Sequence, residues 1–144
     1  MNKNTFSDSI KAAHLRVTKP RLILLTYLQR AKRPQSILEI AAALKKDIDQ
    51  VTVYRSIDAL KKVGIVRELD LRQGHPLYEI TDEQDHHHIV CLGCDRMENF
   101  NGCDSARLAK NALKQTTAFG KITGHSFEFF GFCNVCIKSN LTTV

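Results

Sequence analysis

The sequence lacks several features that would assign it to a broad class. It has no apolar run long enough to cross a membrane, so we expect no membrane partner. Its first residues, Met1-Asn2-Lys3-Asn4, lead into a polar stretch and not into the apolar region of a signal peptide, so we expect a cytoplasmic protein. The five cysteines are an odd number, which suits metal binding in the cytosol better than a secreted disulfide framework.

Net charge is absent from the second half of the chain. Residues 83–144 hold six basic and six acidic side chains, whereas residues 1–82 hold 15 Lys and Arg against nine Asp and Glu. The basic surplus favours a polyanionic partner for the first half, although a solvated basic surface has the same composition. The length of 144 residues suits two small domains, which we expect at 1–81 and 82–144 with a polar hinge at 81–85.

The first domain shows the pattern of four short helices followed by a β-hairpin. Apolar residues at helical spacing, with capping residues and a stop at Gly64, predict these helices. Their predicted ends are near Leu15, Arg30, Leu44 and Val63. Partial alternation then predicts two strands, over 65–71 and 77–80, around a turn.

This pattern is typical of a winged helix-turn-helix domain. The last helix of such a domain enters the DNA major groove and the hairpin lies along the phosphates. The side chains expected to face DNA are Gln50, Thr52, Tyr54 and Arg55, which suit contacts to base edges and phosphates. The alternative is a small helical domain whose basic residues are only solvated.

Two Cys-x-x-Cys pairs stand far apart in the second half: Cys91 with Cys94, and Cys133 with Cys136. Four thiolates complete a closed tetrahedral site, so we expect a structural zinc ion that stabilises this domain. Two disulfides or a redox-active dithiol are the alternatives.

The second domain is predicted to be α/β. Alternation over 86–91 places His87 and Cys91 on one face of a strand and His86 and His88 on the other. A second strand over 96–101, a helix from the Asp104 cap to about Gln115, and a third strand over 121–132 follow. The helix is expected to bury the apolar side chains Ala106, Leu108, Ala109, Ala112 and Leu113. So small a sheet leaves apolar surface open, so we expect a homodimer.

Three motifs, in this order, resemble the ferric uptake regulator (Fur) family. They are Arg16-Val17-Thr18-x-Pro20-Arg21, Val51-Thr52-Val53-Tyr54-Arg55 and His86-x-His88-x-x-Cys91-x-x-Cys94. The resemblance runs from about residue 10 to Cys136. It implies a dimeric, metal-activated repressor with an N-terminal winged helix and a C-terminal α/β dimerisation domain. It also implies that Tyr54 and Arg55 face the operator and that Arg16 lies near the minor groove or backbone. We include Arg21, which ends the first motif, among the DNA-binding residues.

A second, regulatory metal site is predicted at Glu79, His86 and His88, where a bound ion would fix one domain against the other. Relatives usually carry a further histidine where this chain has Pro34 and Gln35. They also carry an acidic residue where it has Asn99, with Glu98 one step out of register. The candidates to complete the site are Asp70, His75, Glu98 or water.

The missing oxygen and histidine ligands favour a four-coordinate zinc site over a six-coordinate iron or manganese site. The predicted regulatory ion is therefore Zn²⁺ ahead of Fe²⁺, with both kept as candidates. A solvated polar strand is the alternative at these residues.

A third site is predicted from His87 and His125, with Asp85 or Asp104 adding oxygen ligands. Relatives often have an acidic residue where this chain has Ala106 and Arg107, and a hydrogen-bonded strand histidine is the alternative reading of His125. We expect Cys103 to be a small buried hydrophobic residue. His14 and His75 are expected at the surface.

Together these features predict a metal-dependent transcriptional repressor that senses zinc or iron and binds palindromic double-stranded operators as a dimer. The alternatives are a peroxide-sensing regulator of the same family and a zinc-stapled interaction module without a metal switch. No His-Glu-x-x-His spacing of a zinc hydrolase is present, so we expect neither an enzyme nor a small organic substrate.

Overall fold

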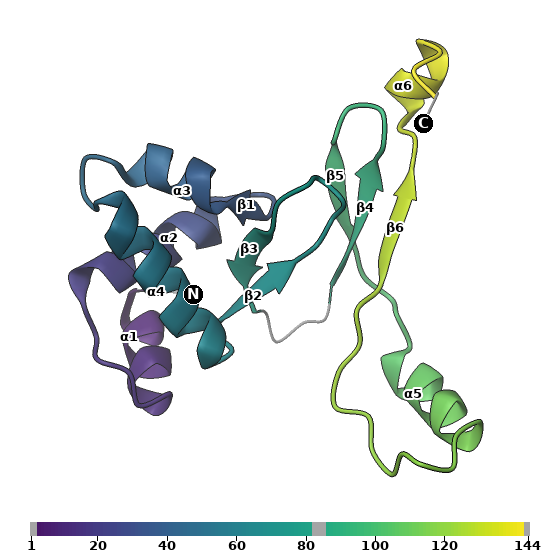
Figure 1. The fold of residues 1–144 in the computed structure, drawn as a ribbon, viewed down its shortest axis with the longest axis horizontal. Helices are drawn as coiled ribbons and strands as arrows, with labels where there is room; N and C mark the ends of the chain where they lie inside the picture. Colours follow the sequence, from purple (N-terminus) through teal and green to yellow (C-terminus); the bar gives the residue numbers. More distant parts are fainter. Residues whose placement is uncertain (1–2, 82–85, 143–144) are drawn as a thin grey trace. The chain divides into compact units, whose positions relative to one another are not determined.

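The computed structural model describes residues 3–81 and 86–142, and the chain divides into two compact units, Met1–Thr81 and Asp82–Val144 (Figure 1). The first unit contains α1 (Lys3–Ala12), α2 (Lys19–Arg30), β1 (Gln35–Ser36), α3 (Ile37–Leu44), α4 (Gln50–Lys62), β2 (Val66–Leu69) and β3 (Leu77–Ile80). The second contains β4 (His87–Cys91), β5 (Met97–Phe100), α5 (Ser105–Lys114), β6 (Glu128–Gly131) and α6 (Asn134–Lys138). None of the described helices is long and apolar enough to span a membrane.

Local chemistry sets the helix ends of the first unit. Ser36 and Glu39 form a reciprocal capping box at the start of α3. The backbone N–H of Thr52 donates to Asp49 Oδ1 over 2.9 Å, which caps α4. Gly64 follows α4 with φ of 75°, a left-handed conformation that glycine adopts without a steric penalty. These helices lie close to where the sequence predicts them.

The first unit is a winged helix, as predicted. Its helices and hairpin enclose one hydrophobic core, formed by Phe6, Ile10, Leu24, Leu25, Leu28, Ile40, Leu44, Ile48, Val53, Ile57, Leu60, Val66 and Tyr78. Strands β2 and β3 pair antiparallel, and β1 pairs with the other edge of β3. The sequence did not predict β1, because two residues are too few to show alternation.

The second unit is a small α/β unit built on a sheet with strand order β5-β4-β6 (Figure 1). Strand β4 pairs antiparallel with β5 and parallel with β6. Few side chains are buried among its described residues: Val90, Cys91, Cys136, His87 and His88. This unit therefore has little hydrophobic core of its own.

Two predictions for the second unit are wrong. The last strand covers only Glu128–Gly131 and not 121–132, because its partner β4 offers pairing only from His88 to Cys91. The predicted helix forms as α5 with Asp104 as its cap, but its apolar face is not buried, and Leu108 is 54% exposed. Among the described residues of this single chain, no helix or strand covers the apolar face of α5.

Candidate functional site

The two cysteine pairs meet at one end of the second unit. Cys91 ends β4 and Cys94 lies in the turn after it, whereas Cys133 caps α6 and Cys136 lies within it. Parallel pairing of β4 with β6, in which Cys91 lies opposite Gly131, brings the two pairs together. The four Sγ atoms all lie within 4.8 Å of one another.

The spacing of the sulfur atoms fits a tetrahedral ion. Cys94 Sγ lies 3.7 Å from Cys133 Sγ. Sulfur atoms bonded to one tetrahedral zinc ion lie roughly 3.8 Å apart, whereas disulfide sulfurs are bonded at about 2.05 Å. All five cysteines are free thiols in the structure, which does not match the alternative of two disulfides, whereas a reduced dithiol has the same free thiols. The residues present fit a structural zinc ion.

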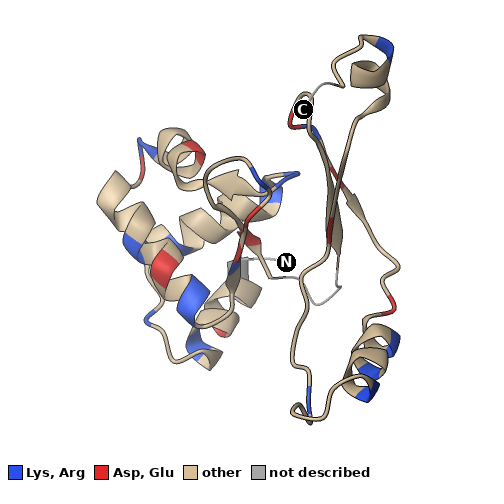
Figure 2. Cartoon of the chain, turned by 45° about the vertical axis from the view of Figure 1, so that its right-hand side comes forward, with Lys and Arg blue, Asp and Glu red and all other residues tan. Residues whose placement is uncertain are grey.

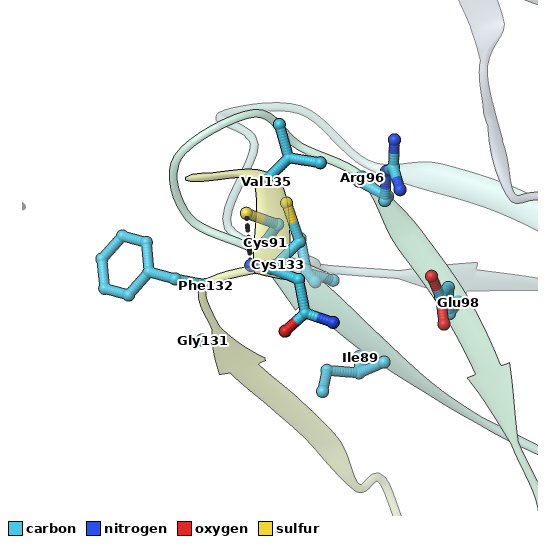
Figure 3. Close-up of a pocket in the computed structure, with 10 residues that line it drawn as sticks. Ile89, Cys91, Arg96, Glu98, Gly131, Phe132, Cys133 and Val135 are labelled. Atoms are coloured by element: carbon cyan, nitrogen blue, oxygen red, sulfur yellow. Dashed lines mark hydrogen bonds between the residues drawn. The ribbon is translucent and has the colours of Figure 1, made fainter. Parts of the chain in front are cut away.

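Two backbone features help the cysteines converge. A Cβ atom at Gly93 would lie 3.0 Å from Cys136 Sγ and 2.6 Å from the backbone oxygen of Leu141, so only glycine permits this approach. The backbone N–H of Cys133 donates to Cys91 Sγ over 3.2 Å, as Figure 3 shows. That bond lowers the pKa of Cys91 to about 6, whereas burial raises the pKa of Cys136 to about 12. Zinc binding therefore has to displace the proton of Cys136.

A cavity of about 200 Å³ adjoins the cysteine cluster (Figure 3). The residues that line it include the apolar Ile89, Phe132 and Val135, and Ile89 and Val135 are 44% and 56% exposed. The end of the second unit that carries the four cysteines thus presents exposed apolar surface in the single chain.

His86 and His88, the predicted regulatory histidines, lie together in the second unit. Their ring centroids are 5.2 Å apart in an edge-to-face arrangement, which agrees with the predicted shared strand face. His88 lies opposite Asn99 on β5 and beside Glu128 on β6, so neighbouring strands offer an amide and a carboxylate to this region.

Glu79 belongs to the first unit, where it lies directly opposite Arg67 on the wing. Arg67 Nε donates to Glu79 Oε1 over 2.6 Å. Sequence reasoning missed this ion pair, because nothing local links positions 67 and 79. Gln35, which stands where relatives carry a histidine, is buried: its Oε1 accepts from the Tyr27 hydroxyl over 2.9 Å, and its Nε2 donates to two backbone oxygens.

His87 and His125 approach each other, with ring centroids 5.1 Å apart. Asp85 lies outside the described residues, and Asp104 serves as the α5 cap by accepting from the N–H of Arg107 over 3.0 Å. His125 precedes β6, so it does not lie in a strand, although the predicted strand over 121–132 included it. The expectation for Cys103 is wrong: it is only half-buried, and its Sγ lies 3.8 Å from His125 Nε2. No sequence spacing signalled this approach across 22 residues.

The predicted DNA-facing side chains gather at the N-terminal part of α4. Gln50, Tyr54 and Arg55 are exposed, whereas Val53, Ile57 and Leu60 of the same helix are buried in the core. The Thr52 hydroxyl donates to Asp49 Oδ2 over 2.6 Å, which ties this side chain to the helix cap. The helix thus presents an exposed face that includes the Arg55 side chain.

Basic residues also surround the start of α2. Arg16 is exposed, and the Arg21 guanidinium donates to the Arg16 backbone oxygen, which ties the first turn of α2 to the preceding loop. Residues 1–81 carry 15 Lys and Arg against 8 Asp and Glu, and Figure 2 marks these charges on the chain. The first unit is therefore the basic one.

Comparisons with known proteins agree over nearly the whole chain. The family model described as the Ferric uptake regulator family matches residues 12–130. The ferric uptake regulation protein of Yersinia pestis is 30% identical over 131 residues, 88% of this chain and 87% of its own. The Vibrio cholerae ferric uptake regulator (Fur) structure has a TM-score of 0.71 and 30% identity, covering 88% of this chain and 98% of that one. The Helicobacter pylori Fur structure, described as having three functional metal binding sites, has a TM-score of 0.75 at 24% identity and covers 95% of each chain. That last likeness shows the fold alone.

Proposed function

The chain belongs to the ferric uptake regulator family of metal-responsive transcriptional regulators, and from this premise we propose that it is a homodimeric repressor of palindromic operators. Family members are transcription regulators, so the chain is a DNA-binding regulator and not an enzyme. The proposal includes a cytoplasmic location, because the operator DNA lies there.

The observation that carries the proposal is the exposed polar face of α4 on a basic winged helix. The helix before the wing is the one that enters the major groove in this class of domain. Arg55 and Gln50 suit bidentate contacts to guanine and adenine, and Tyr54 and Thr52 suit phosphates or a thymine methyl group. Arg16, in the loop before α2, and Arg21, in the first turn of α2, would add contacts to the DNA backbone near the minor groove.

Cys91, Cys94, Cys133 and Cys136 are proposed as the ligands of a structural zinc ion. Support comes from their convergence within 4.8 Å and from the scarcity of buried hydrophobic side chains in the described part of their unit. The free energy of zinc binding would then contribute to folding this unit.

Glu79, His86 and His88 are proposed as the regulatory ligands. Glu79 lies on the last strand of the wing, and the two histidines lie at the start of the second unit. One ion bound to all three would restrict the orientation of the two units, and metal concentration would thereby set the affinity for DNA. The ion has to compete with Arg67 for the Glu79 carboxylate.

Zinc suits this ligand set better than iron. The Gln35 amide is bound to Tyr27 and to the backbone, so it supports the loop before α3 and does not replace the histidine of relatives. Two imidazoles and one carboxylate, completed by one further ligand, match four-coordinate zinc more closely than six-coordinate iron.

A DNA-binding titration tests the proposal. Duplexes selected from a random pool by the zinc-loaded protein serve as probes, and fluorescence anisotropy measures affinity at fixed salt with added Zn²⁺, Fe²⁺ or Mn²⁺. We expect Zn²⁺ to tighten binding most. His86→Ala and His88→Ala should each remove the metal response and leave the weak, metal-independent binding. Zinc that leaves the affinity unchanged would contradict the switch.

Arg55→Ala tests separately whether α4 contacts the DNA. It should weaken binding by about 1–3 kcal/mol at saturating metal, because one side chain at the base edges is lost. The matched control is Lys62→Ala on the same helix, where Lys62 Nζ pairs with Asp58 over 2.8 Å. Equal effects of the two substitutions would contradict the assignment of the exposed α4 face to DNA.

A further inference from the structure

We propose that Arg67 acts as a built-in competitor for the Glu79 carboxylate and thereby sets the metal concentration at which the regulator responds. This inference rests on the proposed function, in which Glu79 is a regulatory ligand, and it adds a residue that binds no ion itself. Arg67 is a positioning residue, because it acts on metal binding only through Glu79.

The strand register of the wing brings Arg67 and Glu79 together. Strands β2 and β3 pair antiparallel, with Arg67 directly opposite Glu79 (Figure 1). Side chains alternate along a strand, so both lie on the face opposite to Val66 and Tyr78, which belong to the hydrophobic core. Directly opposed side chains on one face of a sheet are close enough for opposite charges to meet. The folded hairpin therefore always presents Arg67 to the Glu79 carboxylate.

Two donors of the guanidinium meet one carboxylate oxygen. Arg67 Nε donates to Glu79 Oε1 over 2.6 Å, and Arg67 Nη2 lies 2.5 Å from the same oxygen. The two side chains are only 29% and 13% exposed, whereas Lys61 and Glu68, which form another ion pair of this unit, are both exposed. Water screens a shielded pair less than an exposed one, so Arg67 is an effective partner for Glu79.

The ion pair and a metal ion need the same carboxylate. An ionised carboxylate only accepts, and the lone pairs that it offers to a guanidinium are those that it would offer to an ion. Glu79 therefore has to release Arg67 before it can serve fully as a ligand. The apparent dissociation constant for metal rises by the inverse of the fraction of molecules in which the carboxylate is released.

A competitor of this kind changes the threshold of the response and not its final extent. Arg67 opposes binding of the ion to Glu79, but it does not alter the fully loaded protein, in which the carboxylate has been released. Its removal should lower the metal concentration that gives half of the response and leave the affinity for DNA at saturating metal unchanged.

Zinc titration of the full-length protein, with its cysteine cluster already filled with zinc, tests the inference. Free Zn²⁺ is set by a chelator buffer, DNA binding is followed by fluorescence anisotropy, and circular dichroism verifies that each variant is folded. Arg67→Gln keeps hydrogen-bond donors but loses the charge, and we expect it to lower the zinc concentration at half-maximal DNA binding about 10-fold. Arg67→Lys, which keeps the charge, should remain closer to wild type.

Direct zinc binding is the second measurement. The Zn²⁺ equivalent that His86→Ala removes identifies the regulatory site, and Arg67→Gln should tighten this equivalent by the same factor. Glu79→Gln should weaken it, and Arg67→Gln should have little further effect in the Glu79→Gln background, because both substitutions act on one contact.

Lys61→Gln is the matched control. It removes the charge that pairs with Glu68 over 2.6 Å, an ion pair of the same unit that does not involve Glu79. The zinc concentration at half-maximal DNA binding should stay at the wild-type value in this variant. A shift equal to that of Arg67→Gln would overturn the inference, because any lost ion pair would then have the same effect.

The failures of the two proposals are distinguishable. Wild-type zinc binding in Glu79→Gln would overturn the proposed ligand set and the role of Arg67 with it. If Glu79→Gln weakens zinc binding but Arg67→Gln leaves the threshold unchanged, only the role of Arg67 fails. Weaker DNA binding of Arg67→Gln at saturating zinc, with an unchanged threshold, would indicate a DNA contact and would also overturn that role.

Discussion

Glu39 illustrates how one side chain stabilises two neighbouring structures. Its Oε2 accepts from the backbone N–H of Ser36 over 2.8 Å, and its Oε1 pairs with the Arg33 guanidinium. The hydrogen bond from Arg33 is the main reason that the pKa of Glu39 falls to about 2. A lowered pKa in the folded state stabilises the fold above the ordinary pKa of 4.5, and this contribution is lost as the pH falls toward 2.

Glu39→Gln tests this contribution. The amide oxygen can still accept from Ser36, but the charge beside Arg33 is lost. We expect a loss of about 0.5–1 kcal/mol in unfolding free energy at pH 7, because a partly exposed ion pair is screened by solvent. The difference from wild type should shrink below about pH 4.5. Urea unfolding at matched pH and metal content measures it, and a difference that is independent of pH would contradict the role of the charge.

Contacts between residues close in sequence follow from local spacing, whereas contacts between residues far apart in sequence do not. Ser36 and Glu39 have capping-box spacing, and the capping box is present. Asp49 lies three residues before Thr52, and it caps α4 by accepting from the Thr52 backbone N–H. The Arg67–Glu79 pair and the approach of Cys103 to His125 depend on strand register and on the path of a long connection, so no local spacing indicates them.

Helix α5 is the element whose surroundings differ most from expectation. None of its described residues is buried, although Leu108, Ala109 and Ala112 border a hollow beside residues 122–125. Exposed aromatic side chains continue the apolar surface, with Phe119 at 69% and Phe129 at 47%. An amphipathic helix whose apolar face stays exposed among the described residues supports the proposed homodimer.

Leu108→Glu tests whether this face is covered by a second copy. Burying a leucine contributes about 1.5–3 kcal/mol, and a symmetric dimer loses that contribution twice. We therefore expect the dimer dissociation constant to rise at least about 100-fold in sedimentation experiments. Lys110→Glu, on an exposed position of the same helix, is the control and should leave assembly nearly unchanged. A dimer that tolerates Leu108→Glu would require a different interface.

At the scale of the whole molecule, the two units are stabilised in different ways. The first has a continuous core of leucine, isoleucine, valine and aromatic side chains. In the described part of the second, only Val90, Cys91 and Cys136 are buried hydrophobic residues, and two of these are proposed zinc ligands. Metal binding should therefore determine the stability of the second unit far more than that of the first.

Zinc removal tests this difference. A strong chelator, or Cys91→Ser, should greatly reduce amide exchange protection in β4 and β6, because their thiolate crosslink is lost. Protection at Leu24 and Ile57 in the first unit should be largely retained. Hydrogen exchange followed by mass spectrometry measures both regions in one sample. Equal loss in the two units, or no loss in either, would contradict a zinc-dependent second unit.

The sequence by itself determined the winged helix, the order of the elements apart from β1 and α6, and the two cysteine pairs, because these depend on residue spacing within a few turns or strands. It also predicted that His86 and His88 share one face, since side chains alternate along a strand. Only the tertiary structure decided that α5 leaves its apolar face open, that Arg67 pairs with Glu79, and that Cys103 lies near His87 and His125. These features depend on which distant segments the folded chain brings into contact, and the spacing of neighbouring residues does not encode that.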